Sequence, residues 1–282
     1  MEQQKFKTVG IGVTFSPNLK ANLYESARLT LMYGCKLVLI HIGDPSEEKE
    51  AKFKEILAPF QSQGLTFEVV FNTGEPVTAI LQTVAEKKID LLILGALKRE
   101  KFLKYYMGSI ARKITRKASC SVLLLINPSV ERVPCKHVVV NGLEHEKTKE
   151  AIAAAFFVAH ALESERITIV EEIKQQEIAV AINDDKSLRK ATLKKEKLRR
   201  REDSRIRKLL DAIPEIQRKN ISINMQPIFG KRGYSIGHYA LVARADLLVM
   251  NAPEKTGFWD RLFPHDIEYI LSELPTDLLI IQ

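Results

Sequence analysis

Short apolar runs alternate with longer amphipathic segments along the whole chain. The runs within 87–98 and 120–128 are rich in Leu, Ile and Val and do not alternate between apolar and polar residues. Continuous apolar runs of this length are typical of strands buried on both faces of a parallel sheet, and the segments between them have helical spacing. Because parallel strands need crossover connections, we expect open, doubly wound α/β sheets with helices on both faces.

The predicted order of elements occurs twice. Residues 7–42 predict a strand, a loop, an amphipathic helix and a second strand, and residues 136–173 predict the same order at nearly the same spacing. Later in each half, KKIDLLILGALK at 87–98 matches ARADLLVMNAPE at 243–254. We therefore expect a tandem duplication of two mainly parallel five-stranded sheets. The expected domains are 1–130 and 136–282, joined where two prolines interrupt the pattern near 127–136.

Composition agrees with an ordinary globular protein. The chain has 282 residues, of which 45% are hydrophobic and 28% charged, enough for two domains and unlike a disordered sequence. No apolar run approaches the roughly 18–20 residues of a membrane helix, and the first residues lack a secretory pattern, so we expect a cytoplasmic protein. Cys35, Cys120 and Cys135 form no close-spaced pair, which favours buried or inert thiols over a disulfide or a zinc site.

Positive charge is concentrated in one predicted helix. The formal net charge is +8, and much of the excess lies in 186–210. This pattern predicts a helix with a heavily solvated face, and the alternative is a surface for nucleic acid or an acidic partner. The candidate inward positions are Leu188, Leu193, Leu198, Ile206, Leu209 and Leu210.

A glycine-containing loop at 91–114 is the strongest candidate site. Gly95 ends a predicted strand, while Gly108, Ser109 and Ile110 begin the next helix. Glycine lets backbone N–H groups approach a phosphate closely, and a helix N-terminus adds free donors and a positive dipole end. Lys98 and the basic residues after it add charge. In doubly wound sheets, ligands bind at the carboxyl ends of the strands, so we expect an anion site, with a structural turn as the alternative.

The same residues resemble the universal stress protein family. The shared pattern is a strand, a G-x-x-G position, nine residues, and Gly-Ser opening a helix before a last apolar strand, and both halves of the chain follow the plan. In nucleotide-binding members the motif holds ATP, an aspartate ends the first strand, and a backbone position after the second strand contacts the base. Gly95, Gly108 and Ser109 match the motif. Lys98 stands at the middle glycine and Thr14 at the aspartate, and these two departures weaken the expectation of nucleotide binding.

The resemblance implies an adenine-nucleotide site in the N-terminal half only, with Mg²⁺ accompanying ATP. The implied residues are Thr14, Ile42, Gly95, Lys98, Gly108, Ser109 and Ile110. In the C-terminal half, the matching positions carry Asn141 in the first strand and Asn251, Glu254, Pro264 and His265 in the motif. Proline removes a donor N–H and glutamate repels phosphate, so we expect that the second site has been lost.

Several other residues invite a functional interpretation that we consider weaker than a structural one. His41 and His238 lie among apolar residues and are interpreted as hydrogen-bonded histidines near the core. Glu171 and Glu172 are adjacent in a predicted strand and therefore point to opposite faces, so they are not expected to form an acid and base pair.

Two further segments are also interpreted as structural rather than functional features. His265, with Trp259 nearby, is interpreted as a surface or interface feature. The glycines of 229–248 are expected to shape a turn, the alternative being an anion site at Lys231, Arg232 and Ser235.

The expected function is regulatory rather than enzymatic. The resemblance implies a universal-stress-type protein that binds an adenine nucleotide and whose halves pair as an internal pseudo-dimer through 120–126 and 276–281, with a homodimer also in keeping with the family. The alternative is an interaction scaffold without nucleotide that acts through its basic helix or dimer surfaces. An ATP hydrolase needs a metal-binding carboxylate near the phosphates, and Thr14 stands where one would be expected, so at most weak hydrolysis is anticipated. A protein partner remains unnamed, and nucleic acid and membrane are not expected as partners.

Overall fold

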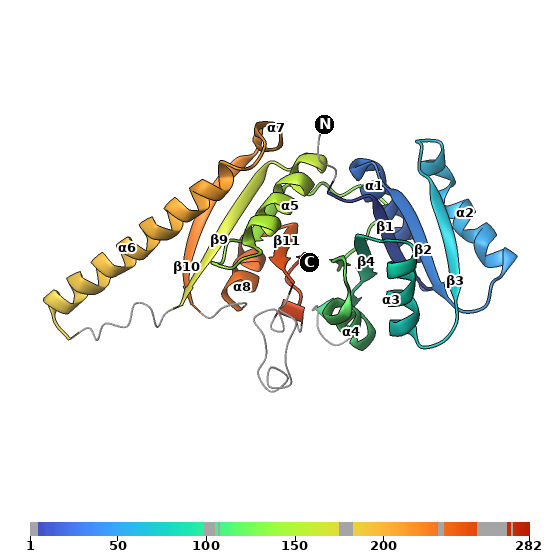
Figure 1. The fold of residues 1–282 in the computed structure, drawn as a ribbon, viewed down its shortest axis with the longest axis horizontal. Helices are drawn as coiled ribbons and strands as arrows, with labels where there is room; N and C mark the ends of the chain where they lie inside the picture. The colour runs from blue at the N-terminus through green and yellow to red at the C-terminus, as the bar shows by residue number, and fades with distance from the viewer. Residues whose placement is uncertain are drawn as a thin grey trace. The chain divides into compact units, whose positions relative to one another are not determined.

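The computed structural model describes residues 5–98, 105–106, 108–174, 183–230, 234–252, 270–271 and 273–282. It divides into two compact units, the first comprising Met1–Pro134 and Leu271–Gln282 and the second Cys135–Ile270 (Figure 1). The division after Pro134 falls inside the segment that the prolines marked as a linker. The last residues of the chain, which sequence alone assigned to the second domain, group with the first unit.

The first unit is built on a mainly parallel sheet. Its strands are β1 (Thr8–Val13), β2 (Lys36–Ile42), β3 (Phe67–Asn72), β4 (Leu91–Gly95), β7 (Ser121–Leu125) and β12 (Asp277–Ile281). Within this unit the spatial order is β12-β7-β4-β1-β2-β3. Every pair from β7 to β3 is parallel. Five parallel strands in the order expected for a doubly wound sheet confirm the predicted fold class.

The helices of this unit follow from local sequence signals. They are α1 (Leu19–Tyr33), α2 (Glu47–Gln61), α3 (Pro76–Glu86) and α4 (Ser109–Lys117). Ser46 caps α2 by accepting the N–H of Lys49, and α1 ends at Gly34, whose φ of 66° is the left-handed conformation that glycine permits. α1 packs beside α2 and α3 beside α4. Because crossovers are right-handed and the direction reverses after β3, the two pairs cover opposite faces of the sheet.

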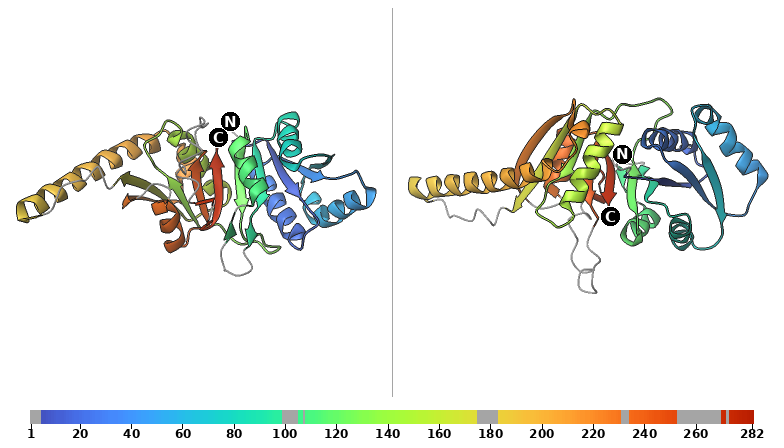
Figure 2. Two further views of the ribbon diagram at one scale, coloured as in Figure 1. Left: turned by 90° about the horizontal axis from the view of Figure 1, so that it is seen from below. Right: turned by 45° about the horizontal axis from the view of Figure 1, so that its top comes forward.

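The second unit repeats the plan with four described strands. They are β8 (His137–Asn141), β9 (Arg166–Lys174), β10 (Ser222–Gly230) and β11 (Leu247–Asn251), in the order β10-β9-β8-β11 and all parallel. Its helices are α5 (Thr148–Ala161), α6 (Asp185–Leu210), α7 (Glu215–Arg218) and α8 (Tyr234–Val242). Figure 2 shows this unit from two further sides.

One pair of equivalent aspartates supports the internal repeat. The carboxylate of Asp90 accepts the backbone N–H groups of Lys7 and Thr8 at 2.8 and 3.2 Å. The carboxylate of Asp246 accepts those of Lys136 and His137 at 2.8 and 2.9 Å. In each half, an aspartate just before the fourth strand therefore holds the start of the first strand in place.

The last strand of the chain pairs with the last strand of the first half. β12 runs antiparallel to β7, with Leu279 opposite Leu123. The Asp277 carboxylate adds a bond from the N–H of Ile126 at 2.8 Å. This is the strand pairing predicted between 120–126 and 276–281. The pseudo-dimer of the two halves stays a prediction.

The long helix α6 differs from its counterpart α2. It begins with a capping box in which Asp184 accepts the N–H of Ser187 at 2.7 Å. Its buried residues are Ala191, Glu202 and Ile206. Leu188 and Leu193 are 49% and 66% exposed, so their prediction as inward positions is wrong. The reason is visible in Figures 1 and 2, where the first turns of α6 extend beyond the ends of β9 and β10.

None of the described helices combines the length and the apolar character that a bilayer-spanning segment requires.

Candidate functional site

Three of the predicted site residues lie at the carboxyl ends of neighbouring strands in the first unit. Thr14 follows β1 and is exposed, Gly95 ends β4 and is exposed, and Ile42 ends β2 and is half-buried. β1 pairs with β4 on one side and with β2 on the other. From β1 the chain continues to β2 and β3 on one side, and it then returns to β4 and β7 on the other side. The strand order therefore reverses between β1 and β4, which is where doubly wound sheets bind ligands.

The N-terminus of α4 supplies backbone donors in the same half. Gly108 is the N-cap residue, and among the described residues no side-chain capping bond is made at the start of the helix, which opens with Ser109 and Ile110. Both residues are exposed, Ile110 by 46%. Free N–H groups and the positive end of the helix dipole favour an anion at such a terminus.

The basic loop before α4 contains a short strand pair that sequence analysis did not predict. Lys98 lies on β5 (Leu97–Lys98), in antiparallel register with Tyr105 on β6 (Tyr105–Tyr106). The pair shows that the chain turns back on itself between β4 and α4. Residues 99–104 and 107, which carry much of the predicted loop, lie outside the described residues.

Asn22 is a candidate site residue that the sequence did not reveal. Its side chain lies against Gly95, such that a Cβ atom on Gly95 would be 3.5 Å from both Asn22 Oδ1 and Nδ2. Asn22 Oδ1 is buried and has no hydrogen-bond partner within the described part of the chain. An asparagine on an amphipathic helix gives no signal in the sequence. Only the packing of α1 beside the carboxyl end of β4 brings this acceptor to the site.

An aromatic cluster lies next to Thr14. Phe15 is 50% exposed, stacks on Phe53 of α2 with ring centroids 5.2 Å apart, and meets the edge of His41 at 5.6 Å. His41 is buried, and its Nδ1 lies 3.1 Å from the Val13 carbonyl oxygen. The interpretation of His41 as a hydrogen-bonded core histidine is confirmed. Phe15 leaves an apolar surface at the end of β1.

The equivalent positions of the second unit are occupied differently. Asn141 is buried, and its Oδ1 accepts the N–H of Leu143 at 2.9 Å. The Nδ2 atom of Asn251 lies 3.5 Å from Thr148 Oγ1. The two asparagine side chains at these positions therefore contact neighbouring groups of the second unit. The other altered motif positions, Glu254, Pro264 and His265, lie outside the described residues together with Trp259, Lys231 and Arg232.

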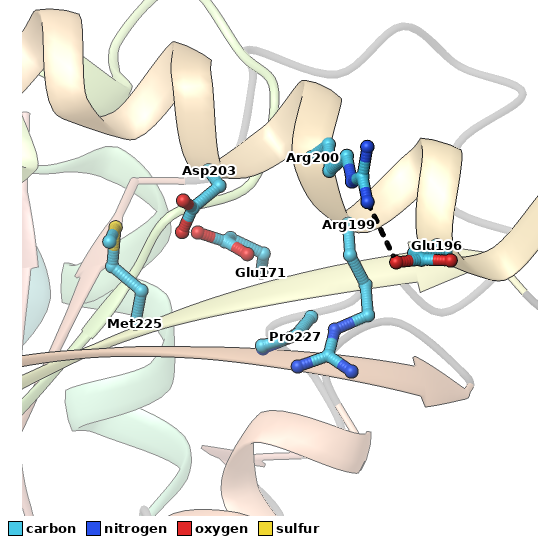
Figure 3. A pocket seen from close by; sticks show the side chains of 7 residues that line it. All are labelled: Glu171, Glu196, Arg199, Arg200, Asp203, Met225 and Pro227. Carbon is cyan, nitrogen blue, oxygen red and sulfur yellow. Dashed lines mark hydrogen bonds and ion pairs between the residues drawn. The ribbon is translucent and has the colours of Figure 1, made fainter.

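The two adjacent glutamates of β9 point to opposite faces, as predicted. Glu172 is buried, and its Oε1 accepts the N–H of Ile236 at 2.8 Å in the first turn of α8. Glu171 is 2% exposed and faces α6 (Figure 3). Burial, strengthened by the nearby Glu202 carboxylate, raises the pKa of Glu171 to about 7. A titrating buried carboxylate in the second unit is a feature that sequence periodicity cannot identify.

Two further expectations can be compared with the structure. Cys120 is buried, as expected, and burial raises the pKa of its thiol to about 12. His238, in contrast, is exposed and stacks on Tyr234 with centroids 6.2 Å apart. Its interpretation as a core histidine is wrong because it lies on the outer side of α8.

Within the described residues, no group of three or more His, Cys, Asp or Glu side chains is placed to hold a metal ion.

Comparison with known proteins gives consistent results. The family model of the universal stress protein family matches residues 44–125. A universal stress protein of Methanocaldococcus jannaschii is 25% identical over 85 residues, which are 30% of this chain and 50% of that protein. The chain thus spans about half the length of this curated relative.

Two solved structures share the fold over nearly the whole chain. A protein of unknown function from Pseudomonas aeruginosa PAO1 superposes with a TM-score of 0.70 at 14% identity, covering 99% of this chain and 93% of that one. A universal stress protein from Archaeoglobus fulgidus DSM 4304 superposes with a TM-score of 0.64 at 15% identity, covering 98% of each chain. At these identities the comparisons establish the fold of both halves.

Proposed function

Because residues 44–125 match the model of the universal stress protein family, we propose that the chain is a regulatory protein of this kind whose N-terminal half binds an adenine nucleotide. The second half keeps the fold and has lost this site. Binding, rather than chemical turnover, is the proposed activity.

The observation that supports the proposal is the grouping of open positions at the reversal of strand order in the first unit. Thr14 and Gly95 are exposed at the ends of paired strands, and the first turn of α4 has no side-chain cap. In the proposed complex, the N–H groups of Ser109 and Ile110 bind phosphate oxygens and the Ser109 hydroxyl donates to them. Lys98 contributes charge, and Mg²⁺ accompanies the phosphates of ATP.

The nucleoside would lie along the ends of β1 and β2. The Thr14 hydroxyl is placed to hydrogen-bond the ribose, and the backbone after β2 at Ile42 to bond the base. Phe15 offers an apolar surface beside Thr14, and Asn22 adds an acceptor beside Gly95. A regulatory role is preferred to hydrolysis because Thr14 has no carboxylate to bind a metal ion or position water.

The test is isothermal titration calorimetry of the full chain with ATP, in the presence and absence of Mg²⁺. Ser109→Glu places a negative charge where the phosphates would bind, and because a carboxylate favours a helix N-terminus, the helix should be retained. Gln82→Glu, on the exposed face of α3, is the matched control for charge. We expect saturable binding, weakened at least tenfold by Ser109→Glu and unchanged by the control.

Absence of saturable binding at millimolar ATP would refute the proposal, as would equal binding by Ser109→Glu and wild type. Gly108→Val provides an independent check, since its side chain would obstruct the backbone donors without changing charge. Phosphate release over hours, followed in the same samples, would reveal hydrolysis if the regulatory assignment were wrong.

A second candidate function is supported by the charge of α6. Residues 185–210 contain twelve Lys or Arg and four Asp or Glu, a net charge of +8 that equals that of the whole chain. The helix also exposes Leu188 and Leu193. An interaction scaffold would use this surface to bind an acidic protein segment.

Poly-L-glutamate is a suitable probe for that function. If the scaffold hypothesis holds, its binding should weaken with salt and with Lys190→Glu/Lys194→Glu, but not with Lys52→Glu/Lys54→Glu on α2. Equal effects of the two pairs of substitutions would indicate only the general charge of the protein. A short DNA duplex, measured in parallel, distinguishes an acidic protein from nucleic acid.

A further inference from the structure

A cavity in the second unit lies between α6 and the sheet. It has a volume of about 320 Å³ and is lined by the β9 residue Glu171, by Met225 and Pro227 of β10, and by charged residues of α6 (Figure 3). This volume is within the range of small-molecule sites, roughly 300–1,000 Å³. The cavity is separate from the proposed nucleotide site, which belongs to the first unit.

Glu171 is the central residue of this cavity. Its side chain is 2% exposed, and its Oε1 is buried with no hydrogen-bond partner in the described part of the protein. Buried carboxylate oxygens are normally paired or hydrogen-bonded, because an unpaired one loses its hydration without compensation. In Figure 3 the carboxylate of Asp203 points toward that of Glu171. The arrangement favours a cationic group between the two.

The other carboxylates around Glu171 already have partners. Glu202 is bound by Arg201 and Arg205, each at 2.8 Å, and Arg205 also donates to the carbonyl oxygen of Gly142. Asp203 lies 3.2 Å from Arg207. Arg201, Arg205 and Arg207 are therefore held by other acceptors.

One arginine at the rim of the cavity does not take part in these ion pairs. Glu196 lies 2.9 Å from Arg200, while the Arg199 guanidinium forms no ion pair with another side chain among the described residues. In Figure 3 it extends toward Pro227. Its positive charge lowers the pKa of Glu171, opposing the larger effect of burial. The cavity thus has an unpaired acid at its base and an unpaired arginine at its rim, with the apolar side chains of Met225 and Pro227 alongside.

We infer that this cavity binds a small zwitterion, in which an ammonium group and a carboxylate are joined by a short apolar chain. The ammonium group donates to the carboxylates of Glu171 and Asp203. The ligand carboxylate binds the Arg199 guanidinium, and the chain contacts Met225 and Pro227. A ligand with charge of only one sign would leave either Glu171 or Arg199 unpaired, which is why a zwitterion fits the site better than an amine or an acid.

The experiment uses the full chain and five probes of defined charge. Glycine, 4-aminobutyrate and 6-aminohexanoate vary the separation of the two charges, while n-butylamine and butyrate carry only one. Binding is followed by chemical-shift changes of the amides of β9, β10 and α6. We expect at least one zwitterion to saturate these changes with an affinity at least tenfold above both single-charge probes.

Two substitutions separate the contacts. Glu171→Gln should weaken the zwitterion and n-butylamine at least tenfold, whereas Arg199→Gln should weaken the zwitterion and leave n-butylamine unchanged. Arg189→Gln, also on α6 and outside the cavity, is the control. Glu171→Asp keeps the charge and should retain part of the affinity, which tests the contact should Glu171→Gln fold poorly.

A coupled readout is the pKa of Glu171, followed through its side-chain carboxyl carbon. A bound ammonium group stabilises the ionised form, so saturation with the zwitterion should lower this pKa. No saturable shift with any of the five probes at 50 mM, about fifty times a dissociation constant of 1 mM, would overturn the assignment. Binding that persists unchanged in both Glu171 variants, or n-butylamine binding as tightly as the zwitterions, would also overturn it.

Discussion

The buried carboxylate of Glu171 predicts a stability that depends on pH. Its pKa rises from the ordinary 4.5 to about 7, first through burial and next through Glu202. The folded protein therefore retains a proton at pH values where the unfolded chain has lost it. The stability gained from this retained proton is fully present below pH 4.5 and is lost as the pH rises to about 7. Above that pH, Glu171 causes no further change in stability. Glu171→Gln removes the titrating group and keeps the shape of the side chain.

The size of the effect follows from the shift. A change of about 2.5 units corresponds to about 3.4 kcal/mol at 1.36 kcal/mol per unit. This shift already includes the opposing charges of Arg205 and Arg199. Because the cavity beside Glu171 admits solvent, screening reduces the energy to about 1–2 kcal/mol. We expect Glu171→Gln to match the wild type near pH 4.5 and to stabilise the second unit by this amount at pH 8.

Hydrogen exchange of β9 and β10, corrected for the intrinsic exchange rate at each pH, measures the stability of the second unit locally. The control is Glu165→Gln, since the Glu165 carboxylate is 67% exposed and forms an ion pair with Lys136 at the surface. An identical pH dependence of protection in Glu171→Gln and wild type would refute the reasoning. So would a variant that is less protected than the wild type at pH 8.

Two other substitutions test packing in the first unit. Gly10→Ala places a Cβ atom 2.6 Å from Ile89 Cδ1 and 3.0 Å from its Cγ2, so we expect destabilisation by about 1–3 kcal/mol in thermal denaturation. Gly12→Ala, where the nearest atom is 3.7 Å away, is its control, and equal costs would show that the contact with Ile89 does not matter. Leu279→Ala in β12 removes a side chain that is 2% exposed and should cost about 2–5 kcal/mol. Leu193→Ala, at 66% exposure, should change stability by less than about 0.5 kcal/mol, and a similar cost for both would contradict the pairing of β12 with β7.

Much of the fold could be predicted from local pattern. Continuous apolar runs identified the strands of both halves, because such runs record which faces of an element are buried. The recurrence of Asp-Leu-Leu identified the duplication. The same logic placed Gly95 at a strand end and Ser109 at a helix start, and it assigned Glu171 and Glu172 to opposite faces. Periods of two and of 3.6 residues carry this information within a single element.

The sequence could not predict how far each element extends past its neighbours. Leu188 and Leu193 have the spacing of inward positions, yet they are exposed because α6 continues beyond β9 and β10. His238 is exposed on α8 for a related reason, since an apolar sequence context does not tell which side of a helix is covered. Burial of a helical face depends on a partner, and the partner is remote in sequence.

The sequence by itself determined two α/β halves of one plan, a glycine and helix start that favour an anion in the first, and replaced motif positions in the second. Only the tertiary structure decided that Asn22 lies against Gly95 and that Glu171 is left unpaired beneath α6. Both results depend on which helix crosses which strand end, and on whether nearby charges are already paired. Both conditions depend in turn on distances between residues far apart in the chain, and a local sequence pattern does not contain these distances.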